Sequence, residues 1–262
     1  MSHRIVVFGA GFLGTRIVKS ISGAEFGRAA DISDRNAVCS ILRILNPEVV
    51  VNAVGKTGKP NVDWCETHQE ETYRANVVGP LILAEECERL KIHLIHLGSG
   101  CIFYGKSSHL DGAWKESDFP NPISFYSKTK AAADFVLGAL PHVSVLRLRM
   151  PIDGVVHVRN LITKISRYKQ VIDVRNSVTV VEDLMHVIKE VSRKKCSGVF
   201  HVTNPGTVFH KELLISYKQY VDPNHRCEYI QEDDLVNKGL AKERRSTCVL
   251  SSERLKEAGI QM

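Results

Sequence analysis

The chain has 262 residues, of which 44% are hydrophobic and 24% charged, a balance typical of a globular protein with one large domain or two small ones. No apolar run approaches membrane-spanning length, no signal-peptide layout precedes the first strand, and seven scattered cysteines argue against disulfides and a metal site, so we expect a cytoplasmic protein. The net charge is +6, and the basic clusters are short and not interleaved with aromatics, which favours a solvated basic surface over nucleic-acid binding. A basic balance also suits an anionic small substrate such as a nucleotide diphosphate.

The first predicted element is a β-branched strand over residues 4–8, followed at once by the turn GAGFLG and a helix over residues 15–21. A strand, Gly-x-Gly-x-x-Gly and a helix in this order predict a dinucleotide site. Gly9 would make the tight turn, Gly11 would let the backbone approach the pyrophosphate, and Gly14 would let helix and strand pack closely. The residues expected to hold the dinucleotide in this turn are Gly9, Gly11, Phe12, Leu13 and Gly14.

The second strand is indicated only faintly, over residues 24–31. In a dinucleotide-binding fold the end of this strand meets the adenosine ribose, where an acid favours NAD and an arginine favours the 2′-phosphate of NADP. Asp31 offers the first and Arg28 the second, although Arg28 can equally be read as a solvated loop residue. We favour NADPH, with NADH as the alternative, and include Ile32 in the expected cofactor site.

The next elements alternate between helix and strand. A helix over residues 33–45 stops before Pro47, and the apolar strand 48–53 leads through Ala53 into a Gly- and Pro-rich loop, the place where open α/β sheets bind ligands. The elements that follow are helix 70–91, strand 92–97, helix 126–140 and strand 143–150. This alternation predicts an α/β protein with a doubly wound parallel sheet, a Rossmann fold.

The pattern changes after residue 150. Residues 159–168, 182–194 and 209–221 are predicted to be helices, and residues 199–203 a strand. We therefore divide the chain into a dinucleotide-binding Rossmann domain, residues 1–150, and a small substrate-binding part, residues 151–262, that packs on the ligand edge of the sheet.

Tyr126 and Lys130 stand four residues apart in a predicted helix, so both side chains lie on one face. A cation beside a phenol favours the phenolate and lowers its reference pKa of about 10. Such a pair can exchange a proton with a carbonyl or alcohol oxygen. The spacing alone is weak evidence, because a surface Tyr and Lys adopt it too.

Ser99, Tyr126 and Lys130, in this order behind a glycine-rich turn, resemble the extended short-chain dehydrogenase/reductases. The resemblance implies that Tyr126 protonates a carbonyl oxygen as hydride arrives. Lys130 would lower the pKa of Tyr126 and hold the nicotinamide ribose, and Ser99 would donate a hydrogen bond to the same oxygen.

A narrower resemblance rests on VVNAVGKTGKPNVDWCE, GCIF, SFYSKTK, LRLRMP, RNLITKISRY, NSVTV and TNPG. These blocks are similar to the nucleotide-rhamnose synthases, the 3,5-epimerase/4-reductases of the plant UDP-rhamnose pathway, and more distantly to dTDP-4-dehydrorhamnose reductases. The match runs from about Pro47 to Leu255 and is poor over residues 14–34, and Phe8 replaces the first glycine of the plant-type turn. It implies NADPH-dependent conversion of UDP-4-keto-6-deoxyglucose, or its dTDP form, into the nucleotide-β-L-rhamnose.

Epimerisation beside a 4-keto group needs a base on one face of the sugar and an acid on the other. The resemblance implies the pair Cys101 and Lys164. Cys101 lies two residues beyond Ser99, so in an extended segment both would project the same way, and a thiol beside a cation can act as a base near neutrality. In the alternative reading Cys101 is a small buried hydrophobe and Lys164 a solvated helix residue.

The resemblance also implies contacts around these residues. Asn76 and Ala53 would lie at the cofactor, and Thr57 would face both cofactor and sugar. The other expected substrate contacts are Asn61, Asp63, Trp64, Arg159, Asn160, Thr179 and Arg245. Its further implications are a homodimer and a separate 4,6-dehydratase that makes the keto sugar. Two alternatives stay open, a 4-reductase without epimerase activity and a non-catalytic binding module like the regulatory subunit of methionine adenosyltransferase.

Overall fold

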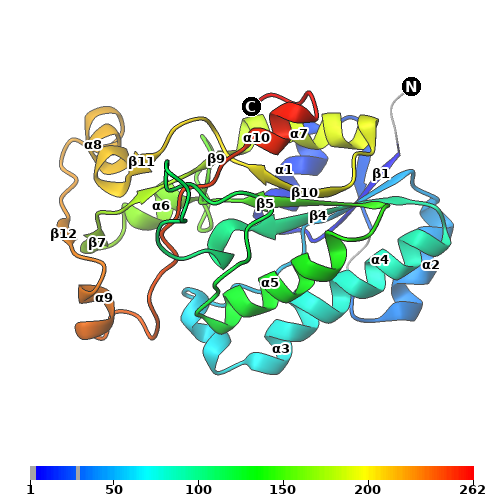
Figure 1. The fold of residues 1–262 in the computed structure, drawn as a ribbon, viewed down its shortest axis with the longest axis horizontal. Helices are drawn as coiled ribbons and strands as arrows, with labels where there is room; N and C mark the ends of the chain where they lie inside the picture. Colours follow the sequence, from blue (N-terminus) through cyan, green and yellow to red (C-terminus); the bar gives the residue numbers. More distant parts are fainter. Residues whose placement is uncertain (1–3, 28–29) are drawn as a thin grey trace.

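Six parallel strands form the centre of the protein, whose computed structural model describes residues 4–27 and 30–262. Their order is β10-β5-β4-β3-β1-β2 (Figure 1). Their bounds are β1 Ile5–Phe8, β2 Ala24–Phe26, β3 Val49–Asn52, β4 His93–Ser99, β5 Val143–Leu148 and β10 Gly198–Val202. All pairs in this sheet are parallel, but β2 and β3 pair with opposite edges of β1, so the direction in which successive strands are added to the sheet reverses between β1 and β3. The carboxyl ends of these two strands therefore form the crevice in which open α/β sheets bind ligands.

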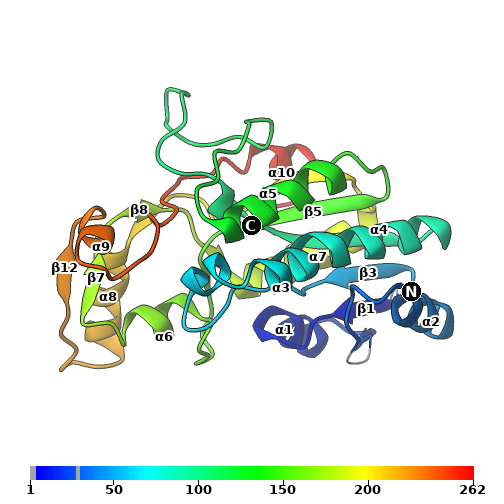
Figure 2. The ribbon, with the colours of Figure 1, turned by 90° about the horizontal axis from the view of Figure 1, so that it is seen from below.

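Helices cover both faces of this sheet, which confirms the doubly wound Rossmann architecture (Figures 1 and 2). One face packs against α1 (Phe12–Ser20), α7 (Val181–Lys194) and the short C-terminal α10 (Glu253–Glu257). The other packs against α2 (Arg35–Leu45), α4 (Gly79–Arg89) and α5 (Phe125–Leu137).

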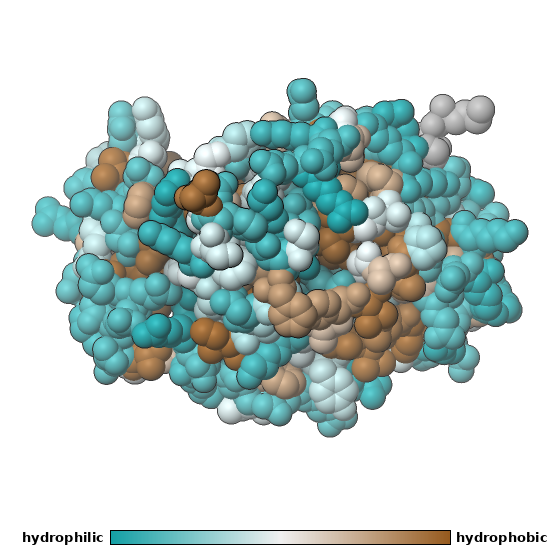
Figure 3. Space-filling model, in the orientation of Figure 1, coloured by the Kyte–Doolittle hydropathy of each residue, from teal (hydrophilic) through white to brown (hydrophobic). Residues whose placement is uncertain are grey.

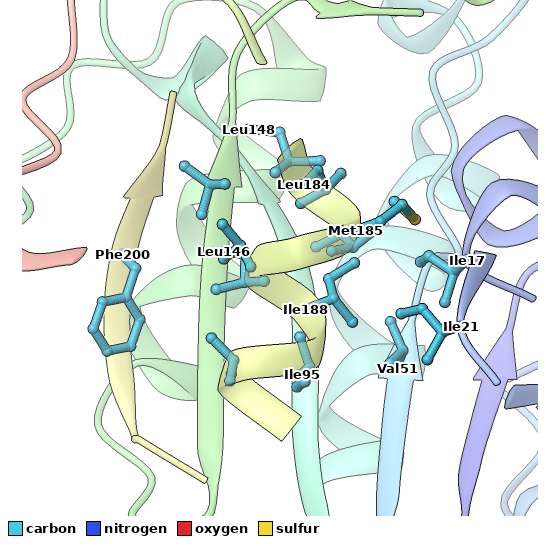
Figure 4. Close-up of a cluster of buried hydrophobic side chains, with 14 of the residues drawn as sticks. Ile17, Ile21, Val51, Ile95, Leu146, Leu148, Leu184, Met185, Ile188 and Phe200 are labelled. Atoms are coloured by element: carbon cyan, nitrogen blue, oxygen red, sulfur yellow. The ribbon is translucent and has the colours of Figure 1, made fainter. Parts of the chain in front are cut away.

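The two cores follow from the alternation of side chains along each strand. Val7 points into the first core and Val6 and Phe8 into the second, although all three are 1% exposed. Figure 4 shows the first core, where Leu184, Met185 and Ile188 of α7 face the strands. Strands buried on both faces read as continuous apolar runs, which is why they were predictable from sequence.

Local signals set the ends of the helices. Asp34 accepts hydrogen bonds from the backbone N–H groups of Asn36 and Ala37, so α2 begins two residues later than predicted. It ends at Asn46 in the left-handed conformation, just before Pro47. In the same way Ser124 accepts from the N–H of Ser127 and caps α5, the helix that carries the tyrosine–lysine pair.

The helix predicted over residues 70–91 is interrupted. Its first part is α3 (Gln69–Tyr73), a π-helical turn follows over Arg74–Val78, and α4 completes it. Pro80 lies in the first turn of α4 and has no N–H to continue the α-helical ladder, which accounts for the wider turn before it. The turn buries Asn76, a predicted site residue.

Short elements gather beyond the carboxyl ends of the sheet strands (Figure 1, left; Figure 2). They are α6 (Leu161–Ile165), β7 (Gln170–Ile172), β8 (Arg175–Asn176), β11 (Val208–Phe209), α8 (His210–Tyr220), β12 (Glu228–Ile230) and α9 (Asp234–Asn237), with β6 (Pro151–Ile152) paired to β9 (Thr179–Val180) nearer the sheet. The helix predicted over residues 159–168 shrinks to α6 because Asn160 caps it. The predicted boundary at residue 150 does not separate the layers, because β10, α7 and α10 complete the sheet domain from beyond it.

The surface in Figure 3 is mainly hydrophilic, with apolar patches between charged side chains. Within residues 4–27 and 30–262, every helix is too short or too polar to cross a bilayer. The same part of the chain contains no group of three or more His, Cys, Asp or Glu side chains arranged to hold a metal ion.

Candidate active site

The glycine-rich turn packs the start of α1 against the end of β3. Gly9 has φ +101°, and a Cβ there would lie 2.7 Å from the carbonyl carbon of Ala53. A Cβ on Gly14 would lie 1.8 Å from the Gly9 carbonyl oxygen. Only glycine fits at either position, as the motif predicts.

Gly11 differs from these two glycines, because its φ of −81° suits any residue and a Cβ there would meet nothing within 4 Å. The open side lies at the N-terminus of α1, where no side chain caps the helix and the first turn carries no acid. Free N–H groups and a helix N-terminus bind phosphates, so this turn fits the pyrophosphate of a dinucleotide.

The other predicted cofactor residues lie around this turn in different ways. Phe12 stacks on His157 with ring centroids 4.7 Å apart, whereas Leu13 packs on the first core. The Ala53 N–H donates to the Phe8 carbonyl oxygen at 2.8 Å, which places Ala53 at the crevice. Ile32 is 2% exposed and belongs to the second core, so its side chain faces the protein interior.

The preference for NADPH over NADH depends on residues at the end of β2, and it stays a prediction. The strand spans only Ala24–Phe26, and Arg28 lies outside the described residues. Asp31 is exposed, and hydrogen bonds from the Ser33 N–H and hydroxyl, each 2.8 Å, lower its pKa. The guanidinium of Arg74 lies 3.3 Å from the Ser33 hydroxyl, a cation at this edge that the sequence reasoning missed.

Ser99, Tyr126 and Lys130 meet where β4 ends beside α5. Ser99 is the last residue of β4, and a hydrogen-bond interaction with Tyr126 favours the phenolate. Burial outweighs this effect and raises the pKa of Tyr126, and the nearby thiol of Cys101 acts in the same direction. This reverses the expected direction, because burial is the largest effect on the phenol. Lys130 is engaged by other partners. Its Nζ donates to the Leu97 carbonyl oxygen at 3.0 Å and lies 3.2 Å from Nε2 of His96.

His96 is a site residue that the sequence reasoning missed. Its Nδ1 lies 3.0 Å from the amide nitrogen of Asn52, whose amide oxygen accepts from the Val54 N–H. The amide therefore donates to Nδ1, and a neutral imidazole carries its proton on Nε2, toward Lys130. Burial lowers the pKa of His96 and that of Lys130, and the charge of Lys130 lowers the pKa of His96 further. The available signal was a pair of histidines, His93 and His96, within a largely apolar strand.

Asn76 holds the loop after β3 against α5. Its amide oxygen accepts from the Lys56 N–H at 2.8 Å, and its amide nitrogen donates to the Lys56 carbonyl at 3.0 Å and to the Thr129 hydroxyl at 3.1 Å. Asn76 is 1% exposed, so its action on a ligand is indirect, through the position of the loop beside Tyr126.

The same loop is clamped from the C-terminal part. Arg245 donates two hydrogen bonds to the carboxylate of Asp63, at 2.7 and 2.8 Å, and Arg159 donates to the Thr57 hydroxyl and to the Gly58 carbonyl oxygen. Asp63 is thereby joined to a segment 182 residues away.

Two further loop residues predicted to contact the sugar have local partners. Asn61 caps the 3₁₀ helix Val62–Glu66, and Trp64 stacks on His68 with centroids 3.8 Å apart. The loop is therefore ordered by its own contacts before any ligand is considered.

Cys101 lies in a 3₁₀ turn, Gly100–Ile102, and not in the extended segment that was predicted. The turn forms because the Cys101 N–H donates to the Ser99 hydroxyl at 3.1 Å, which keeps the two residues adjacent. The half-buried sulfur accepts from Nη1 of Arg149 at 2.9 Å.

Lys164 lies on α6, half-buried and facing the same space. Burial lowers its pKa, and the charges of Arg245 and Arg159 lower it further, whereas Cys101 and Asp63 act in the opposite direction. A lysine with a lowered pKa is a better proton donor near neutrality than a solvated one. The fold thus places the proposed base and acid of epimerisation within electrostatic reach of each other.

Two predicted substrate contacts are buried in this structure. Asn160 is 2% exposed and donates to the carbonyl oxygens of Asp153 and Val155, and Thr179 is fully buried and donates to the Val202 carbonyl. Both therefore have a structural function here, and a substrate could reach them only if this segment moved.

Comparison with known proteins places the chain in one family. The family described as the RmlD substrate binding domain matches residues 3–260. A trifunctional UDP-glucose 4,6-dehydratase/UDP-4-keto-6-deoxy-D-glucose 3,5-epimerase/UDP-4-keto-L-rhamnose-reductase of Arabidopsis thaliana is 41% identical over 221 residues, which is 82% of this chain and 33% of that protein. The chain thus spans about a third of the length of this plant relative.

Solved structures show the same similarity over nearly the whole chain. The crystal structure of the L780 UDP-rhamnose synthase from Acanthamoeba polyphaga mimivirus superposes with a TM-score of 0.91 at 30% identity, covering 98% of this chain and 93% of that one. A dTDP-4-dehydrorhamnose reductase from Bacillus anthracis in complex with NADP has the same fold, with a TM-score of 0.84 at 19% identity and coverage of 100% and 95%.

Proposed function

Because this chain belongs to the RmlD substrate binding domain family, we propose that it is a nucleotide-sugar reductase that also epimerises its substrate. In this proposal it converts UDP-4-keto-6-deoxyglucose into UDP-β-L-rhamnose, with NADPH as cofactor. The observation that supports it best is the meeting of Ser99, Tyr126 and Lys130 with Cys101 and Lys164 at one end of the sheet. A reductase alone would need only the first three.

In the reduction, bound NADPH supplies a hydride to carbon 4. The residues of this chain manage the charge that then develops on the oxygen. Tyr126 remains a phenol at neutral pH, because burial raises its pKa, and so it can donate its proton to that oxygen. Ser99 donates a hydrogen bond to the same atom, and Lys130 contributes positive charge when protonated.

In the epimerisation, the Cys101 thiolate removes a proton from a carbon beside the ketone, and the electron pair of the C–H bond moves into an enolate. The Lys164 ammonium then delivers a proton to the opposite face of the same carbon. Cys101 ends as a thiol and Lys164 as an amine, and proton exchange with water restores both. The lowered pKa of Lys164 suits this donation.

The proposal has consequences for supply and assembly. In this proposal a separate 4,6-dehydratase makes the keto sugar. We further propose a homodimer in the cytoplasm.

The test is an incubation of the protein with UDP-4-keto-6-deoxyglucose and NADPH in deuterated water, read by NMR and mass spectrometry. UDP-rhamnose with deuterium at carbons 3 and 5 is expected. The Cys101→Ala variant should lose this exchange while still binding NADPH, and Cys39→Ala, which removes a half-exposed thiol elsewhere, should not. Unchanged exchange in Cys101→Ala would remove Cys101 from the mechanism.

The alternatives give different products in the same incubation. NADPH oxidation to a non-epimerised 6-deoxy sugar would leave a 4-reductase only. No oxidation with either the UDP or the dTDP substrate would favour a non-catalytic binding module.

A further inference from the structure

Among the residues that the structure describes, Arg149 has the largest fully buried side chain, with 1% of its surface exposed. It follows directly on β5, and its guanidinium reaches under the 3₁₀ turn that carries Cys101. Nε and Nη2 both donate to the amide oxygen of Asn176, Nη2 also donates to the Ser246 carbonyl, and Nη1 donates to the sulfur of Cys101 at 2.9 Å.

The amide and carbonyl acceptors are always neutral, whereas the sulfur of Cys101 can become charged by losing its proton. Within the described residues no carboxylate forms a salt bridge with Arg149, whereas Arg147, two residues earlier, pairs with Asp134 at 2.9 Å. The carboxylate of Glu232 interacts with the charge of Arg149 but forms no salt bridge with it within the described residues. A buried cation with no anionic group in contact is unfavourable. The groups that interact most strongly with the Arg149 charge are the thiols of Cys248 and Cys101.

The two thiols differ in what they can do. Cys248 is 2% exposed and donates its S–H to the Gly100 carbonyl oxygen, and burial raises its pKa, so it stays protonated. Cys101 is half-buried and receives a hydrogen bond from the guanidinium. It is therefore the thiol that can place a negative charge in contact with the guanidinium.

We propose that Arg149 is a positioning residue that holds Cys101 as a thiolate, with its sulfur fixed beside Ser99 and open to the substrate. This inference rests on the proposed function, in which Cys101 is the base of epimerisation. An arginine suits this task better than a lysine or a histidine. It keeps its proton at any pH of interest, so it cannot quench the thiolate by protonating it.

The chain contains a matched comparison. Nη2 of Arg89 donates to the sulfur of Cys39 at 3.0 Å, a similar contact on the surface of α2 and α4. There the guanidinium side chain is 49% exposed and is also paired with the carboxylate of Glu86. Cys39 therefore receives the same type of hydrogen bond from a cation that is already neutralised and solvated.

The first experiment needs no variant. The full chain is treated with iodoacetamide, which reacts with thiolates, at a series of pH values, and alkylation of each cysteine is followed by peptide mass mapping. Cys101 should react at least tenfold faster than Cys39 at pH 6, and its rate should change little up to pH 8. Parallel profiles for Cys101 and Cys39 would overturn the proposal.

The second experiment uses Asn176→Asp, because removal of Arg149 itself could prevent folding. The amide nitrogen of Asn176 has no partner, whereas its oxygen accepts from Arg149, so an aspartate keeps the contacts and adds a carboxylate. The new charge should take over as counter-ion. Alkylation of Cys101 at pH 6 and deuterium exchange at carbons 3 and 5 should each fall at least tenfold, while reduction of UDP-4-keto-L-rhamnose is retained.

The outcomes separate the two proposals. If Asn176→Asp changes neither alkylation nor exchange although Cys101→Ala abolishes exchange, the proposed function stands and the assignment of Arg149 is wrong. If Cys101 shows the thiolate profile and Asn176→Asp removes it, but Cys101→Ala still exchanges, Arg149 holds the thiolate as proposed and Cys101 is not the base.

Discussion

Replacing Gly11 by alanine should separate folding of the glycine-rich turn from its binding function. Gly11 has φ −81° and open space on its Cα, so alanine fits the folded chain without strain. A glycine-to-alanine change at a compatible position stabilises a protein by about 0.4–1 kcal/mol, because the unfolded chain loses freedom. Gly11 is also the N-cap of α1, where alanine is less favourable than glycine. These two effects oppose each other, so the Tm should stay within about 4 °C of the native value.

The same methyl group should block the cofactor, because it occupies the side on which the pyrophosphate approaches the N–H groups of α1. Losing two hydrogen bonds to a charged group, each contributing about 1.5–3 kcal/mol, weakens binding by about 3–6 kcal/mol. The Kd for NADPH should therefore rise by about a hundred- to ten-thousand-fold.

The assay is calorimetric titration with NADPH, together with thermal unfolding of the cofactor-free protein. Gly154→Ala is the control for the general effect of the substitution, since a Cβ at Gly154 also meets nothing within 4 Å. Gly14→Ala should instead lower Tm, because its Cβ would lie 1.8 Å from the Gly9 carbonyl oxygen. A Gly11→Ala variant that binds NADPH within threefold of the native protein would refute this placement of the phosphates.

Three further predictions concern charge. Burial lowers the pKa of His93 from 6.5 to about 4, so the unfolded chain binds a proton that the folded one excludes, and this contribution to stability is lost as pH falls below 6.5. Between pH 6.5 and 5 this lowers the free energy of unfolding by about 2 kcal/mol. In urea titrations, the free energy of unfolding of His93→Gln should fall by about 2 kcal/mol less over the same pH range. Burial also lowers the pKa of Lys130, so the reductase rate should fall with rising pH at a pH lower than the usual lysine pKa. Lys130→Arg keeps its charge and should show a residual rate without that fall. The measurement is NADPH oxidation from pH 6 to 10. Arg245→Gln should lower the free energy of unfolding by about 1–3 kcal/mol, because it breaks the ion pair with Asp63. Adding Asp63→Asn should recover part of this loss. If the effects of the two substitutions simply add in urea titrations, the two side chains do not interact.

Much of the fold and some of the site could be predicted from sequence because their signals are local. Continuous apolar runs marked the sheet strands, and glycines at positions 9, 11 and 14 marked the phosphate turn. Steric limits leave no alternative to glycine at positions 9 and 14, whereas position 11 has open space on the side where the phosphates would bind. The spacing of Tyr126 and Lys130 likewise needs only a helix. The predicted ends of the helices differ from the observed ends by one or more residues. No sequence pattern indicated the π-helical turn that buries Asn76.

Contacts between distant segments were decided by tertiary structure alone. No spacing in the chain indicates that Arg149 lies against Cys101, 48 residues earlier, or that His96 meets Lys130. The sequence determined which chemical groups are present, and a reference pKa follows from each group alone. Burial and neighbouring charges then set the actual state of each group, and both depend on how the chain closes on itself. For that reason the spacing of Tyr126 and Lys130 predicted a lowered tyrosine pKa, whereas burial in the folded protein raises it.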